Sequence, residues 1–369
     1  MRRLTIAPLL CIALGAQGAV SAELTAAQGD AVARLVTAFM AKHGVPGLSV
    51  AIVVDGRLAW SSGYGVADVE NAVPAKATTA YRSASIGKPM TATAAMQLAQ
   101  DGRLDLNADI RDYCPAFPEK PWRITSLHLL GHRSGIRHYG GPHDDEEQYS
   151  TIHYGSVAGA LAPFKGDPLL FEPGTRFLYS TYGFDVLGCV IEGAARASFL
   201  EYMRTRVWGP AGMDATRDDD PSALVPNRAN GYVRSNGELR RARMADVSNR
   251  LPAGGYLTTA VDLARFAEAV LAGRLVTRET FERMTTPARL PDGETVPYGL
   301  GWHVETEPWH EDTWIAHGGS SPGASGILAL MPRHRFAVAV LTNLENAPDR
   351  DLLAEDITRA VLAFSPRTE

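Results

Sequence analysis

Ser85-Ile86-Gly87-Lys88 is the stretch that decides how this chain is interpreted, and it is the only Ser-x-x-Lys in the sequence. The run Met90–Gln100 that follows is helical in spacing and composition. Three residues of helical spacing bring the serine and lysine side chains onto one face. A serine hydroxyl becomes a nucleophile only beside a base, and lysine acts as a base when burial or nearby positive charge lowers its pKa. The pattern predicts a serine nucleophile in a tight turn that leads into a helix.

The composition indicates a globular protein with a large core. Of 369 residues, 45% are hydrophobic and only 21% are charged, which is enough apolar content for two closely packed domains. The 36 basic and 41 acidic residues give a net charge of −5. Because nucleic-acid surfaces are basic, we expect no nucleic-acid partner.

The first residues have the pattern of a secretory signal peptide. Met1-Arg2-Arg3 precedes the apolar run Leu4–Ala16, and Val20-Ser21-Ala22 offers small residues for cleavage before Glu23. The apolar run is short for a membrane span, although an uncleaved anchor is the alternative. We therefore expect residues 1–22 to be removed, giving a secreted, periplasmic protein without stable membrane insertion.

Two cysteines, Cys114 and Cys189, remain after that cleavage. Their number allows one disulfide but no disulfide framework. Cys189 lies in the apolar run Val186–Ile191, which favours a buried free thiol. Neither cysteine has the spacing of a metal ligand, and we expect neither a metal nor a cofactor.

Secondary-structure signals divide the chain into three parts. Apolar residues at helical spacing after residue 31 predict a helix that ends near Gly44. The strands Leu48–Val54 and Arg57–Ser62 follow, joined by the hairpin signal Asp55-Gly56. Thr259 and Asp262 form a capping pattern before another helix. The later signals predict four strands and a closing helix, at Gly299–Val304, Thr313–His317, Gly326–Met331, Phe336–Thr342 and, for the helix, Leu353–Phe364.

Between residues 101 and 230, frequent prolines break the chain into short helical pieces. We therefore predict an α+β fold in which an antiparallel sheet is flanked by helices and accompanied by a mostly helical second domain. The sheet domain would comprise 23–105 and 250–369, and the inserted helical domain 106–249. A catalytic cleft would lie between the two.

Two further patterns offer partners for Ser85. Tyr179 is a candidate proton carrier for a leaving group, provided that cations such as Lys88 lower its pKa; the alternative is a core tyrosine with a bonded hydroxyl. His317-Gly318-Gly319 ends an apolar strand, where glycines permit close approach of a ligand. The backbone amides of Ser320 and Ser85 would then form an oxyanion hole, although a glycine-rich strand end is also typical of a plain turn.

Ser85–Lys88, Tyr179–Thr181 and His317–Gly319, in this order, resemble the three motifs of the serine β-lactamase-like superfamily, which includes class C β-lactamases, D-aminopeptidases, D,D-peptidases and related esterases. The resemblance implies a β-lactamase/penicillin-binding-protein-like fold. It also implies that Ser85 is acylated, Lys88 is its base or proton relay, Tyr179 is the general acid/base and His317 occupies the third motif. Further similar stretches are Leu129–Gly135, Glu172–Gly174, Gly254-Gly255 and Tyr298–Trp302, while Ser134–Tyr139 and Phe177–Thr181 are similar to the mitochondrial serine β-lactamase-like proteins and their bacterial relatives.

Two positions depart from the class C pattern. Thr181 replaces an asparagine that helps to bind an acylamido substrate, and His317 replaces a lysine that holds a carboxylate. A neutral histidine holds an anion less well than lysine. We therefore expect a peptidase or amidase acting on a small molecule or peptide, with ester hydrolysis as the alternative and β-lactam hydrolysis as at most a side activity. The substrate itself and the oligomeric state stay open.

Three other interpretations compete with this one. Gly319-Ser320-Ser321-Pro322-Gly323 fits the Gly-x-Ser-x-Gly elbow of α/β-hydrolases, but a strand follows where a helix is required. A loop metal site would use histidines and acids that lack a recognised ligand spacing. A non-catalytic, self-assembling or binding protein would not need an activated nucleophile. The histidines and acids of that loop are His132, His138, His143, His153 and Asp144–Glu147.

Overall fold

The computed structural model describes residues 23–140, 144–306 and 312–364. The predicted signal peptide at 1–22 lies outside this part of the chain. Within the described ranges, no helix combines the length and the apolar character that crossing a membrane requires.

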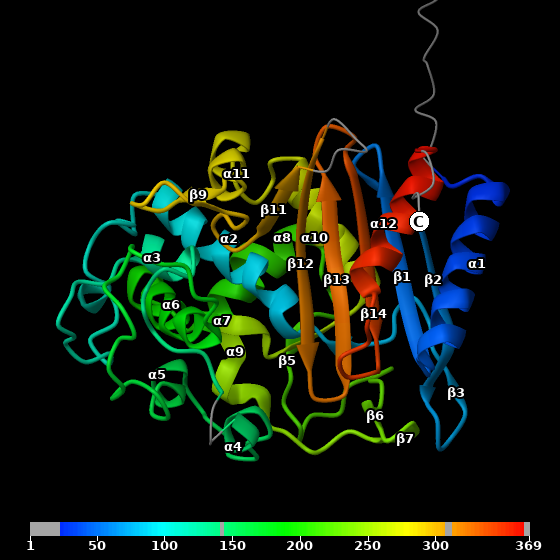
Figure 1. Cartoon of the computed structure of the whole chain (residues 1–369), viewed down its shortest axis with the longest axis horizontal. Helices are drawn as coiled ribbons and strands as arrows, with labels where there is room; N and C mark the ends of the chain where they lie inside the picture. Colours follow the sequence, from blue (N-terminus) through cyan, green and yellow to red (C-terminus); the bar gives the residue numbers. More distant parts are fainter. Residues whose placement is uncertain (1–22, 141–143, 307–311, 365–369) are drawn as a thin grey trace, which may run out of the picture.

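A seven-stranded antiparallel sheet forms the centre of the molecule (Figure 1). Strand β1 pairs with β14, with Leu48 opposite Thr342, so segments from both ends of the chain share one sheet. This confirms the predicted α+β class. In sheet order the strands are β11 (His303–Thr306), β12 (Thr313–Ser321), β13 (Ala324–Met331), β14 (Phe336–Thr342), β1 (Gly47–Val54), β2 (Arg57–Asp68) and β3 (Val73–Pro74).

The predicted hairpin between β1 and β2 is confirmed. Asp55 and Gly56 have φ angles of 51° and 73°, the positive values that a two-residue turn needs to match the twist of its strands. The strand predicted at Gly299–Val304 was placed too early, since β11 begins only at His303. Gly301, with φ of 87°, lies in the left-handed region and prevents an earlier start.

Two helices cover one face of the sheet (Figure 1). These are α1 (Ala26–His43), which ends at Gly44 as predicted, and α12 (Arg350–Leu362). Apolar side chains of both helices pack on alternate residues of the central strands, including Ile52 and Val338, which is the pattern of a sheet face packed on a core. The first turn of α12 also lies beside β12, because a Cβ added at Gly318 of that strand would come within 3.4 Å of the Arg350 and Asp351 side chains.

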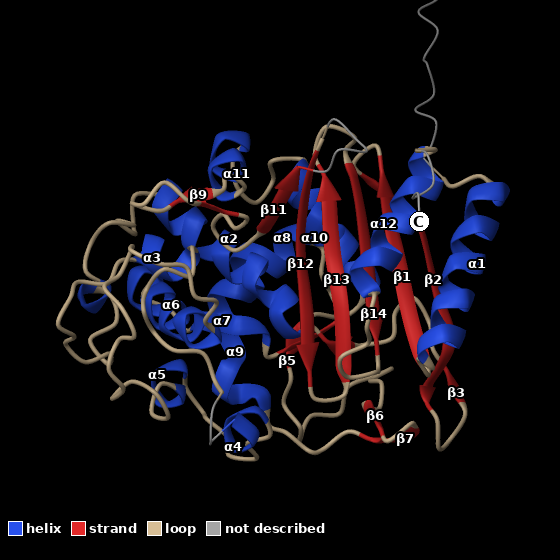
Figure 2. Ribbon diagram, viewed as in Figure 1, coloured by secondary structure: helices blue, strands red, loops and turns tan. Residues whose placement is uncertain are grey.

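Helices from the rest of the chain cover the opposite face and extend beside the sheet (Figure 2). Helix α10 (Ala260–Leu271) begins at the predicted cap, where the Thr259 side chain accepts a hydrogen bond from the Asp262 amide. Helices α2 (Gly87–Gln100) and α6 (Thr181–Ala195) are buried on nearly every side, so the start of each is held rigidly inside the protein.

Short elements complete the helical region. The division into a sheet domain and a helical insertion remains a proposal, because one apolar core joins the helices to the sheet face. The helical elements are η1 (Ala84–Ile86), η2 (Ile110–Asp112), α3 (Ser126–Leu130), α4 (Asp144–Gln148), α5 (Val157–Ala160), α7 (Phe199–Tyr202), η4 (Met203–Trp208), α8 (Gly209–Ala211), η5 (Val247–Arg250), α9 (Leu251–Gly254) and α11 (Arg278–Met284). The remaining strands are β4 (Tyr81–Arg82), β5 (Arg217–Asp218), β6 (Tyr232–Ser235), β7 (Glu238–Arg241), β8 (Tyr256–Thr258), β9 (Ala288–Arg289) and β10 (Thr295–Val296).

The predicted free thiol at Cys189 is wrong, because Cys189 on α6 forms a disulfide with Cys114. Burial of Cys189 was expected correctly, but Cys114 is buried against the same helix. The chain around Cys114 lies directly on α6: a Cβ added at Gly193 would come within 1.8 Å of the Tyr113 carbonyl oxygen. The apolar pattern around Cys189 could not predict that a segment 75 residues away would approach α6 this closely.

Candidate active site

Ser85 lies in the tight turn η1 directly before α2, where the turn was predicted. Ala84 precedes it with φ of 48°, a conformation that is costly for a residue with a side chain and is often found at functional sites. Gly254 makes room for that turn, since a Cβ there would lie 1.7 Å from the Ala84 carbonyl oxygen. The chain therefore maintains a strained turn to present the Ser85 hydroxyl.

The amine of Lys88 is buried directly beside that hydroxyl. Its Nζ donates to Ser85 Oγ at 3.0 Å, to Thr181 Oγ1 at 3.3 Å and to the Ala253 carbonyl oxygen at 3.2 Å. Burial lowers the pKa of Lys88 to about 7, because a charged amine loses its hydration there. A substantial fraction of Lys88 is then neutral near pH 7 and can accept the serine proton.

Asp185 is a neighbour of Lys88 that the sequence analysis missed. It follows Thr181 by one turn of α6, so both side chains lie on one helix face, and it is fully buried. Its charge raises the pKa of Lys88 while Arg250 lowers it. Burial in turn raises the pKa of Asp185 well above its usual range. The four-residue spacing from Thr181 was the available signal.

Tyr179 lies against the same pair. Its hydroxyl interacts with the Ser85 side chain, and its ring centroid is 4.9 Å from Lys88 Nζ. Burial nevertheless raises the pKa of Tyr179, so the condition set for a proton carrier, a pKa lowered by cations such as Lys88, is not met. Lys88 is not among the groups that shift the pKa of Tyr179. Tyr179 therefore keeps its proton at neutral pH.

His317 is buried and held by an ordered chain of hydrogen bonds. Its Nδ1 donates to the Gly318 carbonyl oxygen at 2.7 Å, so Nε2 accepts from the Tyr298 hydroxyl at 3.1 Å. Tyr298 in turn accepts from His132 Nε2, whose Nδ1 accepts from the Ser180 amide. Burial lowers the pKa of both histidines well below 6.5. His317 is therefore neutral and fixed in one orientation.

Strand β12 passes directly beside the nucleophile. A Cβ added at Gly319 would lie 2.9 Å from the Ser85 amide nitrogen, so only glycine permits this approach. Ser320 is next on the strand, and its side chain donates to Asn346 Oδ1 at 2.6 Å. The backbone at residues 319–320 is thus adjacent to the Ser85 amide, where a pair of amides can hold an oxyanion.

A cavity of about 350 Å³ opens onto these groups. Five of the seven residues singled out from the sequence line it, and the other two, Lys88 and Thr181, line a small neighbouring cavity that also includes Ser85 and Ser320. The lining also includes residues of β11 and α12 that the sequence did not indicate. The five are Ser85, Tyr179, His317, Gly319 and Ser320, and the additional polar residues are His303, Glu305, Arg350, Asp351 and Glu355.

A family comparison agrees with this geometry: the beta-lactamase family matches residues 32–362. The chain belongs to the beta-lactamase family. Within it, the chain is 28% identical to the serine beta-lactamase-like protein LACTB, mitochondrial, of Mus musculus, over 80% of this chain and 71% of that protein. It is 27% identical to penicillin-binding protein 4* of Bacillus subtilis, over 82% of this chain and 69% of that protein.

Solved structures of the same fold are similar over most of both chains. The octameric penicillin-binding protein homologue from Pyrococcus abyssi has a TM-score of 0.79 at 25% identity, covering 91% of this chain and 77% of its own. A D-stereospecific amidohydrolase from Streptomyces has a TM-score of 0.73 at 25% identity, covering 90% of this chain and 98% of its own. The beta-lactamase family fold is therefore shared along nearly the entire described chain.

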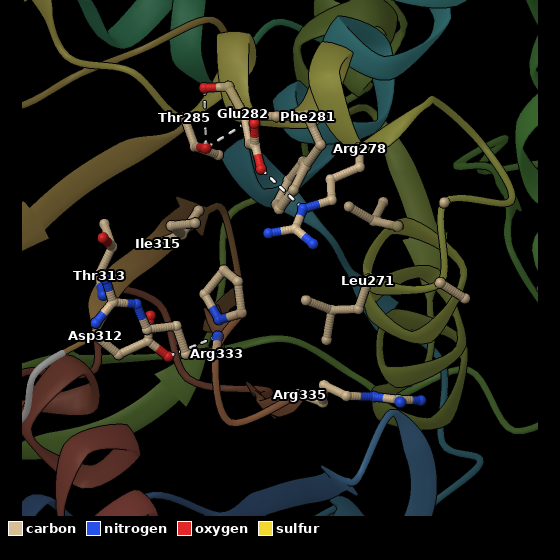
Figure 3. A pocket seen from close by; sticks show the side chains of 14 residues that line it. Leu271, Arg278, Phe281, Glu282, Thr285, Asp312, Thr313, Ile315, Arg333 and Arg335 are labelled. Atoms are coloured by element: carbon tan, nitrogen blue, oxygen red, sulfur yellow. Dashed lines mark hydrogen bonds and ion pairs between the residues drawn. The ribbon is translucent and has the colours of Figure 1, made fainter.

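A larger cavity of this family member, about 970 Å³, lies away from Ser85 between α10, α11 and the start of β12 (Figure 3). Three arginines line it, and Arg278 forms an ion pair with Glu282 at 2.8 Å. Its lining contains no serine, cysteine, lysine or histidine. Ser85 lies instead in the lining of the smaller cavity.

The structure also places the residues of the competing interpretations. Ser321 lies on the hairpin between β12 and β13, opposite Ala324, so it is not on a strand-to-helix elbow. His132 and His138 lie around the Tyr179 ring, whereas His153 bonds Asp246. His143 is outside the described residues, and within the described ranges no three His, Cys, Asp or Glu side chains form a group that could hold a metal ion.

Proposed function

We propose that this protein is a serine hydrolase that cleaves amide or peptide bonds through an acyl-enzyme on Ser85. One observation carries the proposal: a buried Lys88 amine with a pKa of about 7 lies 3.0 Å from Ser85 Oγ. A structural lysine has no need of this environment, since burying an amine costs free energy. A general base is most effective when its pKa is near the working pH.

The proton steps follow from this arrangement. Neutral Lys88 takes the Ser85 proton as Oγ attacks the substrate carbonyl carbon, and the amides of Ser85 and Ser320 hold the oxyanion. Tyr179 donates its proton to the leaving nitrogen as the C–N bond breaks, and it regains a proton from Lys88. Water then attacks the ester by the same steps in reverse order, which frees Ser85.

The choice of amide bonds is supported by two features. Amides have poor leaving groups that need a proton donor, and Tyr179 is kept protonated beside Ser85. One structure of this fold at 25% identity is titled a D-stereospecific amidohydrolase. We therefore place amide or peptide hydrolysis before ester hydrolysis.

The test uses a fluorophosphonate or penicillin probe on the mature protein, with the adduct located by mass spectrometry. We expect labelling at Ser85 and none in Ser85→Ala. Ser321→Ala is the matched control, because it removes the competing serine from the same cleft and should be labelled as well as the wild type. Labelling at another residue, or equal labelling of Ser85→Ala, would overturn the proposal.

We also propose that the protein is exported, with residues 1–22 removed. The Cys114–Cys189 disulfide supports this proposal, because such bonds persist in oxidising compartments such as the bacterial periplasm. Cell fractionation followed by N-terminal sequencing tests it. A mature chain that begins at Glu23 in the periplasmic fraction is the expected result, and an intact Met1 in the cytoplasm would contradict it.

A further inference from the structure

The loop that follows α3 holds the chain on both sides of Tyr179. Before Tyr179, the Leu178 amide donates to the His132 carbonyl oxygen at 2.8 Å. After it, the Ser180 hydroxyl donates to the Arg137 carbonyl oxygen, also at 2.8 Å. Both neighbours of Tyr179 are therefore tied to one segment of the protein.

Two histidines of this loop accept the backbone amides that come next. His132 Nδ1 accepts from the Ser180 amide and His138 Nδ1 accepts from the Thr181 amide, both at 3.1 Å. These amides lie at the start of α6, where backbone N–H groups have no acceptor within the helix. The loop thus fixes the backbone around Tyr179, while the Tyr179 hydroxyl interacts with the Ser85 side chain.

The rings of the same two histidines lie against the Tyr179 ring. The His132 centroid is 4.3 Å from that of Tyr179, with the planes tilted by 40°. The His138 centroid is 5.6 Å away, and the planes meet edge to face at 83°. Contacts on two sides restrict the rotation of the phenol, so each histidine constrains both the backbone and the ring of Tyr179.

Both histidines are neutral acceptors at physiological pH. His132 Nε2 donates to the Tyr298 hydroxyl at 3.1 Å, so its proton is on Nε2 and its Nδ1 has a free lone pair. Burial lowers the pKa of His132 well below 6.5 and that of His138 to about 4. The two bonds to the start of α6 are therefore maintained over the range in which Lys88 becomes neutral.

Helix capping alone does not account for this arrangement. The Ser180 side chain already caps α6 by accepting from the Gly183 amide at 3.0 Å, as serine commonly does at this position. A small side chain or water could accept the remaining amides without touching Tyr179. Here both acceptors are rings, and both lie on Tyr179.

We propose that His132 and His138 are positioning residues that hold the Tyr179 hydroxyl at Ser85, each by accepting a backbone amide just after Tyr179. The proposal rests on the hydrolase function proposed above, in which Tyr179 donates a proton to the leaving nitrogen. Loss of either bond lets the start of α6 shift and moves the hydroxyl away from the leaving group. The effect on turnover then passes through Tyr179.

The test replaces each histidine in two ways and measures kcat on a panel of D- and L-amino acid p-nitroanilides. His138→Leu and His132→Leu remove the acceptor and should lower kcat by up to about a hundredfold, the cost of a misplacement of about 1 Å. His138→Asn and His132→Asn should restore much of that loss, because the asparagine oxygen lies close to where Nδ1 lies. His153→Leu is the matched control, since this histidine bonds Asp246 outside the lining of the Ser85 cavity, and it should keep wild-type turnover.

A double-mutant cycle separates positioning from a general loss of structure. In the Tyr179→Phe background, His138→Leu should lower kcat little further, because the hydroxyl that it positions is already gone. The rate of Ser85 labelling by the fluorophosphonate should change much less than anilide turnover, since fluoride leaves without a proton from Tyr179. A purely structural role would lower turnover and labelling together, in both backgrounds.

The outcomes distinguish failure of this proposal from failure of the hydrolase function. Additive losses in the cycle, a parallel fall in labelling, or unchanged turnover in the leucine variants overturns the positioning role while the hydrolase function stands. A wild type that is not labelled at Ser85, or that is labelled but hydrolyses no anilide of the panel, overturns the amide hydrolase function and this role with it. If a leucine variant does not fold, glutamine replaces it, because its longer side chain places the oxygen away from the Nδ1 position, and the same outcomes decide.

Discussion

At the scale of single residues, the protonation of Lys88 decides when Ser85 can react. Burial lowers the pKa of Lys88 from 10.5 to about 7, so the neutral amine appears as the pH rises through that value. For an uncharged substrate, kcat/KM should therefore rise about tenfold per pH unit below 7 and level off above it. The measurement is a profile of kcat/KM against pH at constant ionic strength. If kcat/KM rose only near pH 10, Lys88 would not be the general base with the lowered pKa.

Tyr179→Phe is the control for that profile. It removes the proton donor and should cut turnover by about two to four decades. The rising limb should stay near pH 7, because the low pKa of Lys88 comes from burial and Tyr179 is not among its causes. If the pH at which kcat/KM rises shifted in Tyr179→Phe, the titrating group would be Tyr179 and not Lys88.

The roles of individual residues were only partly predictable from sequence. Ser85, Lys88, Tyr179 and His317 were singled out by motif, and the structure brings them together around one cavity. Asp185 and Asp351 were missed, because each approaches the site through the packing of a helix and belongs to no local pattern. Whether Tyr179 meets the condition of a lowered pKa could not be predicted, since burial, which raises that pKa, depends on surroundings that a motif does not contain.

At the scale of elements, strand β12 fixes the geometry around Ser85. Gly319→Ala would place a Cβ 2.9 Å from the Ser85 amide nitrogen and 3.0 Å from the Ser83 carbonyl oxygen. Backbone atoms cannot swing aside as a side chain can, so the turn carrying Ser85 must shift. A misplacement on this scale should lower kcat by about a hundredfold, measured with an uncharged substrate. Circular dichroism should show an intact fold.

Gly318→Ala is the matched control on the same strand. Its Cβ would meet the Arg350 Nη2 atom at 3.3 Å and Asp351 Oδ1 at 3.4 Å, both at the ends of side chains that can move. Turnover of an uncharged substrate should therefore fall much less than in Gly319→Ala. If turnover fell equally in the two variants, the result would show that this part of β12 tolerates no side chain. It would not show that Gly319 positions Ser85.

Elements were more predictable than the contacts between them. Periodicity and turn chemistry located α1, the β1–β2 hairpin, α10 and β14, because these signals are local. The exact start of β11 could not be predicted, because the positive φ of Gly301 sets it. The pairing of β1 with β14 was inferred only as a sheet drawn from both chain ends, and its register comes from the structure.

At the scale of the whole molecule, the Cys114–Cys189 disulfide joins a loop of the helical region to α6, the helix whose first turn contacts Lys88. A crosslink across 75 residues of sequence restricts the unfolded chain, and its loss costs about 2–5 kcal/mol of unfolding free energy. Cys114→Ala with Cys189→Ala should therefore lower Tm measurably. The site should keep most of its turnover at 25 °C, because Cys189 lies about 12 Å along α6 from Thr181.

Thermal unfolding with and without dithiothreitol measures this contribution. The reductant should lower Tm of the wild type and leave the double variant unchanged, which separates the bond from other effects of reduction. Alkylation and mass spectrometry of the unreduced protein should find no free thiol at either position. Two alkylated cysteines in protein from an oxidising compartment would contradict the bond and would remove its support for export. Turnover lost in step with Tm would show instead that the helical region and the site unfold as one unit, as their shared core implies.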